Sequence, residues 1–329
     1  MTKILLLFYS QSGEAARAVE VLSRVLSVSD VELVVERIVP TKPYPSPWRS
    51  PIDFFGVLSE CHLGPLPKLE PVGFASHDKY DLIILVYQVW FLAPSLPIQS
   101  LLNSPSAEIC RDAKVITGSV SRAMWHSASE TMKRLLASLR ARHIDNISLT
   151  HQGPAWATFV AAPRALLTGR KDGLLGVFPP AGLDEAELAR LARLATVILN
   201  QRERLREPDH HPLLNGVGAT RVKVRSMLPE FLGFYYFRAW AYPLRFLKRA
   251  GKAFEAVGIT IFIVCLAILI LVGIPIILLI HLAISPWIRR WSAARSARLR
   301  EPSDDSSLFS PAATQHDQHP AQFVDGRSR

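Results

Sequence analysis

The first residues of the chain place a buried strand, a tight turn and an amphipathic helix in immediate succession. Residues 3–9 read KILLLFY, an almost continuous apolar run that is typical of a strand covered on both faces, as in a parallel sheet. The sequence SQSG at 10–13 follows, and Gly13 supplies the backbone freedom that a sharp bend needs. From residue 14 to about 28, apolar residues recur at the three- and four-residue spacing of a helix. This order commits the chain to strand–helix units.

The same alternation continues through the first 203 residues. Further strands are predicted at 31–39, 81–87, 113–118 and 143–150, and helices from Met124 to about Arg142 and at 184–203. Alternating strands and helices form a doubly wound α/β fold, in which loops at the carboxyl ends of the strands carry the binding site. We therefore predict a five-stranded parallel sheet with its site at that edge.

The turn after the first strand has the composition of an anion site. A helix N-terminus presents unpaired N–H groups and the positive end of the helix dipole, which favour a phosphate. Ser10 and Ser12 add hydroxyl donors, and Gly13 permits a close approach of the backbone. The alternative is a plain N-capped helix in which Ser10 or Ser12 is the cap.

Two other predicted strand ends favour a planar ligand beside that turn. VYQVWFLAPSLP at 86–97 contains Trp90 and Phe91, and TGSVSRAMWH at 117–126 contains Gly118 and Trp125. A large apolar ring needs an aromatic platform next to backbone donors that read its polar edge. Each tryptophan alone could equally be core packing. Together with a phosphate turn, the loops favour flavin mononucleotide (FMN).

These segments resemble the flavodoxin-like superfamily over residues 1–203. KILLLFYSQSGEAA is similar to its first strand and phosphate loop, and YDLIILVYQVWFLAPSLPIQSLL looks like the segment that borders the flavin ring. Within that superfamily, TGSVSRAMWHSASETMKRLL (117–136) and LTHQGPAWATFVAAPRALLTGRKD (149–172) resemble the membrane-associated dialkylresorcinol condensing enzymes.

The resemblance implies three groups of cofactor contacts. They are Ser10, Gln11, Ser12 and Gly13 at the phosphate, Val89, Trp90 and Phe91 beside the ring, and Gly118 and Ser119 near its polar edge. Two positions depart from the superfamily pattern. Glu14 replaces a common neutral amide, and Ala15 replaces a common hydroxyl residue. An inward-pointing carboxylate would repel a phosphate, and the missing hydroxyl removes a donor worth about 1 kcal/mol.

Residues 153–183 form a long connection before the final helix of this domain. The connection is rich in apolar residues, which argues against disorder. It is either a lid over the cofactor, or a segment docked on the membrane-facing part of the chain. As a lid it would offer Trp156 to a substrate and Arg164, Arg170 and Lys171 to an anionic group.

The candidate acid–base groups near the predicted site are His151, Arg122 and His126, with His151 preferred because it closes the fifth strand. No metal-ligand spacing and no Ser/His/Asp arrangement is found.

Cys61 and Cys110 do not lie at a predicted strand end, although a ketosynthase needs a nucleophilic cysteine. We therefore predict an FMN-dependent redox step, with NAD(P)H as electron donor, and assign condensation to a partner enzyme.

The C-terminal third has a different composition. Ile259–Ile280 is an uncharged run of 22 residues, long enough to cross a bilayer, and 231–256 mixes aromatic and basic residues as an interfacial helix does. The basic flanks before and after the run are nearly equal, so either a single span or a re-entrant hairpin at Gly273-Ile274-Pro275 is open. The predicted segments are 1–205 (FMN domain), 206–228 (linker), 229–257 (interfacial helix), 258–284 (membrane segment) and 285–329 (basic flank and disordered tail).

Charge supports the same division. The net charge of +10 is concentrated after residue 205, where it suits anionic lipid, and the first 200 residues show no basic face with interleaved aromatics, so no nucleic acid partner is expected. We predict a membrane-tethered oxidoreductase, its soluble domain on the cytoplasmic side, acting on a lipophilic dialkylresorcinol- or polyketide-type substrate. A membrane-anchored electron carrier and a scaffold without cofactor are the alternatives, and a homodimer is left open.

Overall fold

The computed structural model describes residues 1–75, 77–151, 164–173, 180–207, 211–222, 224–273, 291, 295–296 and 298–303. The strands are β1 (Thr2–Phe8), β2 (Val31–Arg37), β3 (Leu82–Trp90), β4 (Ala93–Pro94), β5 (Lys114–Ser121) and β6 (Arg142–Thr150). The helices are α1 (Glu14–Leu26), α2 (Pro51–Gly56), α3 (Leu58–Leu63), α4 (Leu96–Leu102), α5 (His126–Ser138), α7 (Glu185–Asn200), α8 (Val224–Ala250) and α9 (Lys252–Ile268), and a π-helical turn (Leu269–Gly273) extends α9. Two 3₁₀ helices span Pro105–Cys110 and Arg202–Arg206.

The strands are ordered β2-β1-β3-β5-β6, and each of these pairs is parallel. Only the short β4 runs antiparallel, beside the end of β3. This order is that of the flavodoxin-like doubly wound fold. The predicted fold class is therefore confirmed, and the strand order reverses next to β1, where such folds hold their ligand.

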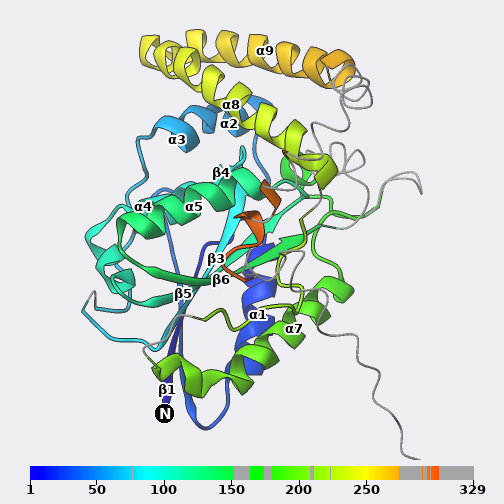
Figure 1. Ribbon diagram of the computed structural model, residues 1–329. Coiled ribbons are helices and arrows are strands. Elements are labelled where there is room, and N and C mark those ends of the chain that lie inside the picture. Colours follow the sequence, from blue (N-terminus) through cyan, green and yellow to red (C-terminus); the bar gives the residue numbers. More distant parts are fainter. Residues whose placement is uncertain are drawn as a thin grey trace, which may run out of the picture.

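Two hydrophobic layers enclose the sheet, one on each face (Figure 1). Ile4 and Leu6 of β1 pack with α1 and α7, whereas Leu5 and Leu7 pack on the opposite face with α4 and α5. All four side chains are fully buried. Successive residues of a strand point to opposite faces, so an apolar run without polar alternation requires helices on both sides.

Two strands are longer than the sequence pattern predicts, and this moves the loops of the site. β3 continues to Trp90 and closes a tight hairpin with β4 through Phe91 and Leu92, whose φ angles are 48° and 62°. β5 continues to Ser121 because its serines and threonine pack within the sheet, although they break the apolar pattern. The loops after β3 and β5 therefore begin three residues later than predicted.

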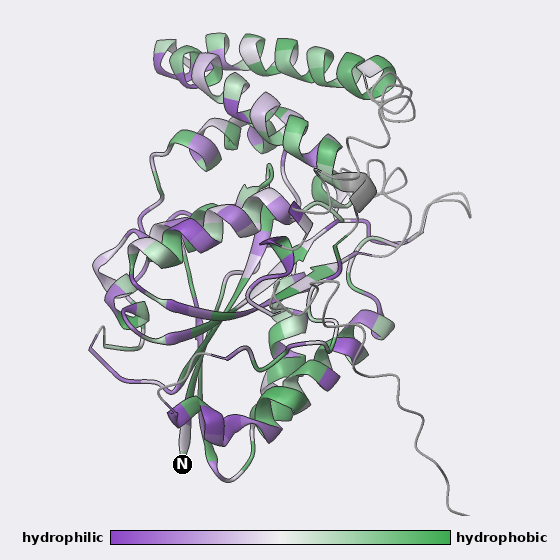
Figure 2. Cartoon of the chain, viewed as in Figure 1, coloured by the Kyte–Doolittle hydropathy of each residue, from purple (hydrophilic) through white to green (hydrophobic). Residues whose placement is uncertain are grey.

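Helices α8 and α9 cross the molecule beyond the carboxyl edge of the sheet, on the side opposite the N-terminus (Figure 1). The chain turns between them at Gly251, whose φ of 132° a side chain would disfavour. Phe262 of α9 is fully buried against Phe55, Phe237 and Trp240. Lys252–Gly273 is the one helix of the described residues that is long and apolar enough to cross a membrane (Figure 2).

A buried carboxylate ties α8 to the sheet domain. Glu230 is completely buried, and its Oε1 accepts a hydrogen bond of 2.7 Å from the N–H of Ser127 in the first turn of α5. Its Oε2 lies 2.8 Å from Nδ1 of His126. A carboxylate at a helix N-terminus is favourable because it meets unpaired N–H groups. Residues 224–230, part of which the sequence predicts as a linker, are thus helical.

A second buried ionic cluster, on α7, holds the end of β6. Glu187 accepts hydrogen bonds from Arg190 at 2.7 and 2.9 Å and from the Thr150 N–H at 3.3 Å. Arg190 also donates to the carbonyl of Gly218 at 2.9 Å. Both side chains are at most 6% exposed, so neither charge can be satisfied by water instead.

Replacing Glu187 with Ala should lower the free energy of unfolding by about 3–5 kcal/mol, because it leaves the Arg190 charge buried without its carboxylate. Urea unfolding of the detergent-purified protein measures this loss. Glu185→Ala, two residues earlier on α7, is the matched control, because its side chain is 89% exposed and its pair with Arg17 should contribute less than about 1 kcal/mol. Equal effects of the two variants would contradict the prediction.

Candidate functional site

A cavity of about 630 Å³ lies at the carboxyl edge of the sheet. Its walls come from the loops after β1, β3, β5 and β6, residues 165–171 and 181–182, α2, α8 and the inner face of α9. This volume is within the range of about 300–1,000 Å³ that small-molecule and cofactor sites occupy. The cavity therefore lies at the carboxyl edge of the sheet, where the sequence predicts the site.

The loop between β1 and α1 is fixed by side-chain hydrogen bonds. Gln88 of β3 accepts from the Gln11 N–H at 2.9 Å and donates to Ser12 Oγ at 3.0 Å. Ser10 is buried, and its Oγ accepts from the Ala16 N–H at 3.1 Å, so its hydroxyl caps α1 instead of lining the cavity. Gly13 has a φ of 90°, which permits the bend.

This arrangement leaves backbone donors at the cavity end of α1. The N–H groups of residues 12–15 have no hydrogen-bond acceptor among the described residues. Consecutive free N–H groups at a helix N-terminus form an anion site. Ser12 lines the cavity beside them, and its hydroxyl proton remains available to a ligand.

Glu14, the first departure from the superfamily loop, lines the cavity, but its carboxylate is held by hydrogen bonds. Its carboxylate accepts from the Leu183 N–H at 2.8 Å and from Lys171 Nζ at 2.6 Å, and the side chain is only 4% exposed. A Cβ at Gly182 would lie 2.8 Å from Glu14 Oε2, so only glycine fits there. Burial alone would raise the pKa of Glu14, but the hydrogen bonds from Lys171 and Leu183 outweigh it and hold this pKa below its usual value.

Lys171 places a positive charge at the mouth of the loop. Besides Glu14, its Nζ donates to the Ser12 carbonyl at 2.7 Å. Segment 164–173 is itself held against the domain, because the Trp48 N–H donates to the Leu166 carbonyl at 2.7 Å. Of the three cations that the sequence places in the connection, Lys171 lines the cavity. Arg164 instead pairs with Asp172 at 3.0 Å, and Arg170 lies 3.6 Å from the same carboxylate.

An aromatic wall adjoins the loop. Trp90 lines the cavity and makes edge contacts with Tyr9, Tyr44 and Trp48, at centroid distances of 5.7, 5.0 and 6.3 Å. Val89 and Phe91 line it too, as predicted from the resemblance. Trp48 is a wall residue that the sequence analysis missed, since its stretch YPSPWRSP follows no strand pattern. Pro-flanked aromatics near a predicted site are the signal that could have found it.

Two buried polar atoms in the cavity wall lack partners. Trp48 Nε1 and Ser121 Oγ have no hydrogen-bond partner among the described residues, although their side chains are buried. Both residues line the cavity. Buried polar groups are normally paired, so an unpaired donor and an unpaired hydroxyl in one cavity favour a bound ligand with polar edges.

Arg122 and His151, two of the predicted acid–base groups, lie in the cavity wall. Burial lowers the pKa of the Arg122 guanidinium to about 10, so it stays charged at neutral pH. Burial lowers the pKa of His151 to about 4, and the positive charges of Arg122 and Lys171 act in the same direction against the attraction of Glu14. His151 is therefore neutral at pH 7 and can donate or accept a hydrogen bond.

Several predicted positions are corrected. Gly118 and Ser119 lie inside β5, paired with Val86 and Tyr87, because the strand extends to Ser121; the cavity edge is formed by 120–124 instead. Trp125 is buried with Met227 and Leu299, away from the cavity. His126 faces Glu230 and does not line the cavity. Trp156 lies outside the described residues.

The cysteines do not contribute a nucleophile to this wall. Cys61 and Cys110 are buried and do not line the cavity, and burial raises the pKa of both thiols, that of Cys110 to about 12. Within the described ranges, no group of three or more His, Cys, Asp or Glu side chains is placed to hold a metal ion.

No family model and no curated protein matches the chain. Among solved structures, a flavoprotein in complex with FMN from Lactobacillus acidophilus NCFM is 20% identical, with 41% of this chain and 87% of that chain covered and a TM-score of 0.34. A WrbA-like flavodoxin from Agrobacterium tumefaciens is 13% identical, with 63% and 100% covered and a TM-score of 0.36. A flavodoxin bound to FMN from Fusobacterium nucleatum is 10% identical, with 61% and 99% covered and a TM-score of 0.32. The assignment of the fold rests on the strand order described above.

The lowered pKa of His151 gives a pH prediction. A histidine whose pKa falls from about 6.5 in the unfolded chain to about 4 in the folded protein stabilises the fold fully above pH 6.5. That contribution is lost as the pH falls from about 6.5 to about 4, because the unfolded chain takes up the proton first. We expect the free energy of unfolding of His151→Asn to fall less than that of the parent protein as the pH decreases through this range.

The measurement is the free energy of urea unfolding of both proteins at pH 7.5 and pH 5. Burial also lowers the pKa values of His62 and His143, so both proteins should lose stability in acid. The quantity to compare is therefore the difference in free energy of unfolding between the variant and the parent at each pH. A difference between variant and parent that does not change with pH would show that His151 titrates normally.

Proposed function

We propose that this chain is a membrane-associated oxidoreductase of flavodoxin-like fold that binds FMN in the cavity and acts on a lipophilic substrate. The observation that carries the proposal is the continuity of one cavity. It joins the unpaired N–H groups at the start of α1, an aromatic wall around Trp48 and Trp90, and an apolar end at α9.

The residues of the loop fit the phosphate of FMN. Free N–H groups at residues 12–15 can donate to its oxygens, and the Lys171 ammonium offsets the dianionic charge. Glu14 does not oppose this, since its charge is paired with Lys171 and, at 3.5 Å, with Arg17. The flavin ring would lie along Trp90 and Trp48, with Trp48 Nε1 and Ser121 Oγ at its polar edges.

When bound, FMN supplies the hydride and electron chemistry, and the protein supplies position and polarity. Arg122 carries a positive charge in the partly buried cavity wall, so it can hold and polarise a substrate oxygen. Neutral His151 can hold a proton near that oxygen or accept one from it. Gln88 keeps the loop in its binding conformation through its two hydrogen bonds.

The apolar end of the cavity supports a substrate of low polarity. Phe55, Phe237, Ile263, Leu266 and Ile270 line it, beyond the aromatic wall. An electron carrier needs only an exposed ring edge, so this extension favours an enzyme over the carrier alternative. A dialkylresorcinol- or polyketide-type substrate is the class implied by the family resemblance, and a partner enzyme would carry out the carbon–carbon condensation.

Membrane association is supported by the exposed apolar surface of α9. Phe254 is 57% exposed and Leu271 is 75% exposed, so the described residues leave most of both side chains uncovered. Fully exposed side chains of this size are unfavourable in water, at roughly 1.5–3 kcal/mol each relative to burial. The cytoplasmic placement of the domain stays a prediction.

Purified protein should bind FMN, and Lys171→Met should weaken binding about tenfold to a hundredfold. The substitution removes a charged donor at the phosphate and leaves Glu14 with a less compensated charge. Titration of FMN followed by flavin absorbance and fluorescence measures the dissociation constants. The matched control is Arg170→Met, which removes a neighbouring exposed cation that does not line the cavity, and should change the affinity less than twofold.

A parent protein that stays colourless and does not bind added FMN would refute the cofactor assignment and favour the scaffold alternative. Once FMN binding is established, anaerobic titration with NADH or NADPH tests the predicted electron donor. Bleaching of the flavin absorbance near 450 nm is the expected result.

A further inference from the structure

The apolar residues of α9 fall into two stripes on opposite sides of the helix. Phe254, Val257, Ile261, Val264, Ile268 and Leu271 form the outer stripe, and each is at least 50% exposed. Ile259, Phe262, Ile263, Leu266 and Ile270 form the inner stripe, which packs on the domain or lines the cavity. The outer stripe repeats at three- and four-residue spacing along about 26 Å of helix.

The inner stripe is attached to the domain along most of the length of the helix. Near the start, Ile259 and Phe262 are buried with Leu58 and Phe55 of α3 and α2. Towards the end, Leu266 and Ile270 are part of the cavity wall that includes Trp90 and Arg122. The helix therefore cannot leave the domain without opening the cavity and exposing this second apolar face.

Polar groups beside α9 oppose a transmembrane position of this packed unit. Lys248 donates to Glu60 of α3 at 2.8 Å and to the Gly56 carbonyl at 3.1 Å, and lies 3.3 Å from Glu255 of α9. If α9 crossed a bilayer in this packing, α2 and α3 with their charges would enter the hydrocarbon. Charged groups there are strongly disfavoured.

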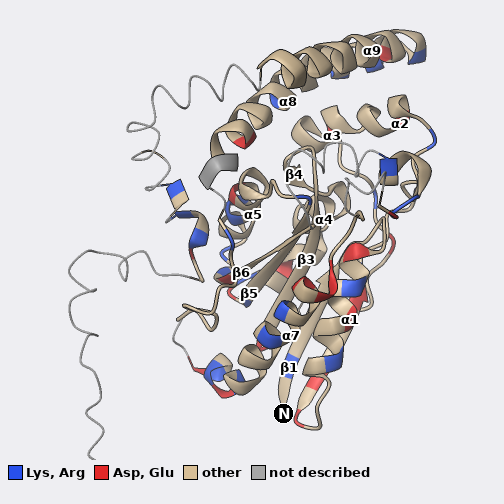
Figure 3. Ribbon diagram, turned by 90° about the vertical axis from the view of Figure 1, so that its right-hand side faces the viewer, with Lys and Arg blue, Asp and Glu red and all other residues tan. Residues whose placement is uncertain are grey.

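Cations and aromatics border the outer stripe. Lys248, Arg249 and Lys252 are exposed at the turn between α8 and α9, and Phe246 beside them is 73% exposed. Charged residues are sparse along the rest of α9, which is tan over most of its length in Figure 3. In an anionic bilayer, an apolar stripe on one side of a helix suits the upper acyl region, and basic side chains beside it suit the anionic headgroups.

We propose that α9 does not span the membrane but lies in the plane of an anionic bilayer, with its outer stripe in the upper acyl region and its inner stripe as the wall of the cavity. This inference rests on the membrane association in the proposed function and specifies its geometry. It places the apolar end of the cavity, behind Leu266 and Ile270, next to the lipid, from which a lipophilic substrate can enter without crossing water.

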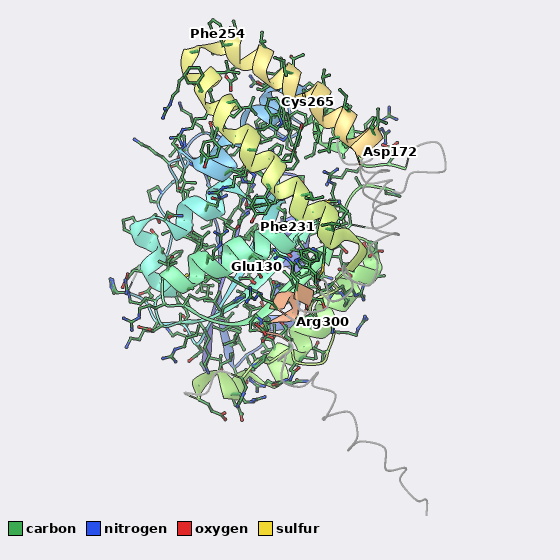
Figure 4. All side chains as sticks on the ribbon, turned by 45° about the horizontal axis from the view of Figure 1, so that its top comes forward. Glu130, Asp172, Phe231, Phe254, Cys265 and Arg300 are labelled. Carbon is green, nitrogen blue, oxygen red and sulfur yellow. The ribbon has the colours of Figure 1, made fainter. Side chains whose placement is uncertain are left out.

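Depth-dependent quenching on the full-length protein tests this geometry. Single cysteines for a fluorescent label are introduced by Phe254→Cys, Val264→Cys and Leu271→Cys, all on the outer stripe, in a Cys265→Ser background. Figure 4 labels Phe254 and Cys265 on this helix. Cys61 and Cys110 are buried and should not react in the folded protein. The vesicles contain phosphatidylcholine and phosphatidylglycerol with spin labels at defined acyl depths.

In the proposed geometry, the three labels give the same shallow depth within about 3 Å. In a spanning helix, by contrast, the labels at 254 and 271 differ in position by up to about 26 Å along the membrane normal. Ser138→Cys, exposed on α5 away from α9, is the negative control and should not be quenched.

Each other outcome has a distinct meaning. Graded depths along α9 would overturn the in-plane geometry and leave membrane association intact. Absence of quenching together with failure to co-sediment with anionic vesicles would overturn both. A stable dimer in which the three labels are shielded by a second copy, without vesicle binding, would show that the outer stripe is a protein interface and would also overturn the proposal. The FMN titration is independent of all three results.

Discussion

The site depends on backbone N–H groups at the start of α1 that the protein itself does not satisfy. β1 is buried on both faces and ends at Phe8, so α1 must begin within a few residues and its first N–H groups point beyond the sheet edge. Gln88, Ser10 and Gly13 fix the loop in this shape without using the donors of residues 12–15. Unpaired N–H groups of this kind favour an anion, and the aromatic wall and the cavity adjoin them.

The charges near the loop show how an unusual residue is accommodated. A glutamate at position 14 would repel a phosphate if its charge were unpaired, but Lys171 and the Leu183 N–H bind its carboxylate, and Gly182 leaves room for it. Lys171 then serves both groups, because the same ammonium that pairs with Glu14 also stands over the Ser12 carbonyl. The long connection after β6 thus supplies the counter-charge for a change in the loop after β1, about 157 positions earlier in the chain.

The fold could be predicted from the sequence because its signals are local. The apolar run of β1 and the periodicity of α1 and α7 depend only on neighbouring residues, and the observed parallel pairing of β2, β1, β3, β5 and β6 agrees with the predicted doubly wound sheet. The site could be predicted only in part. Gln11, Ser12, Trp90, Arg122 and His151 were found in the cavity wall, near the predicted strand ends from which they were proposed. Gly118 and Ser119 were not, since small polar residues within a buried strand look like the start of a loop.

The roles of Trp48 and Glu230 come from contacts between distant segments; the prolines around Trp48 mark it only as a candidate, and nothing in the sequence marks Glu230. Trp48 reaches the wall through its packing on Trp90, and Glu230 is recognised only when α8 meets the N-terminus of α5. The apolar run in the C-terminal third shows what the contacts add to the composition. Its composition alone predicts a helix that crosses a bilayer, since hydropathy counts all faces of the helix together.

The structure separates those faces. The inner stripe of α9 completes the wall of a cavity that Arg122 and Lys171 also line. The outer stripe is an exposed apolar surface. The same helix therefore belongs both to the protein interior and to an apolar surface. A helix in that position would couple ligand binding at the inner stripe to membrane attachment at the outer stripe. In the proposed in-plane geometry, any movement that withdrew α9 into the bilayer would open the cavity, and a ligand that filled the apolar end of the cavity would contact the inner stripe of the helix whose outer stripe contacts lipid. Membrane attachment and ligand binding should therefore strengthen each other, with equal coupling in the two directions as thermodynamic linkage requires.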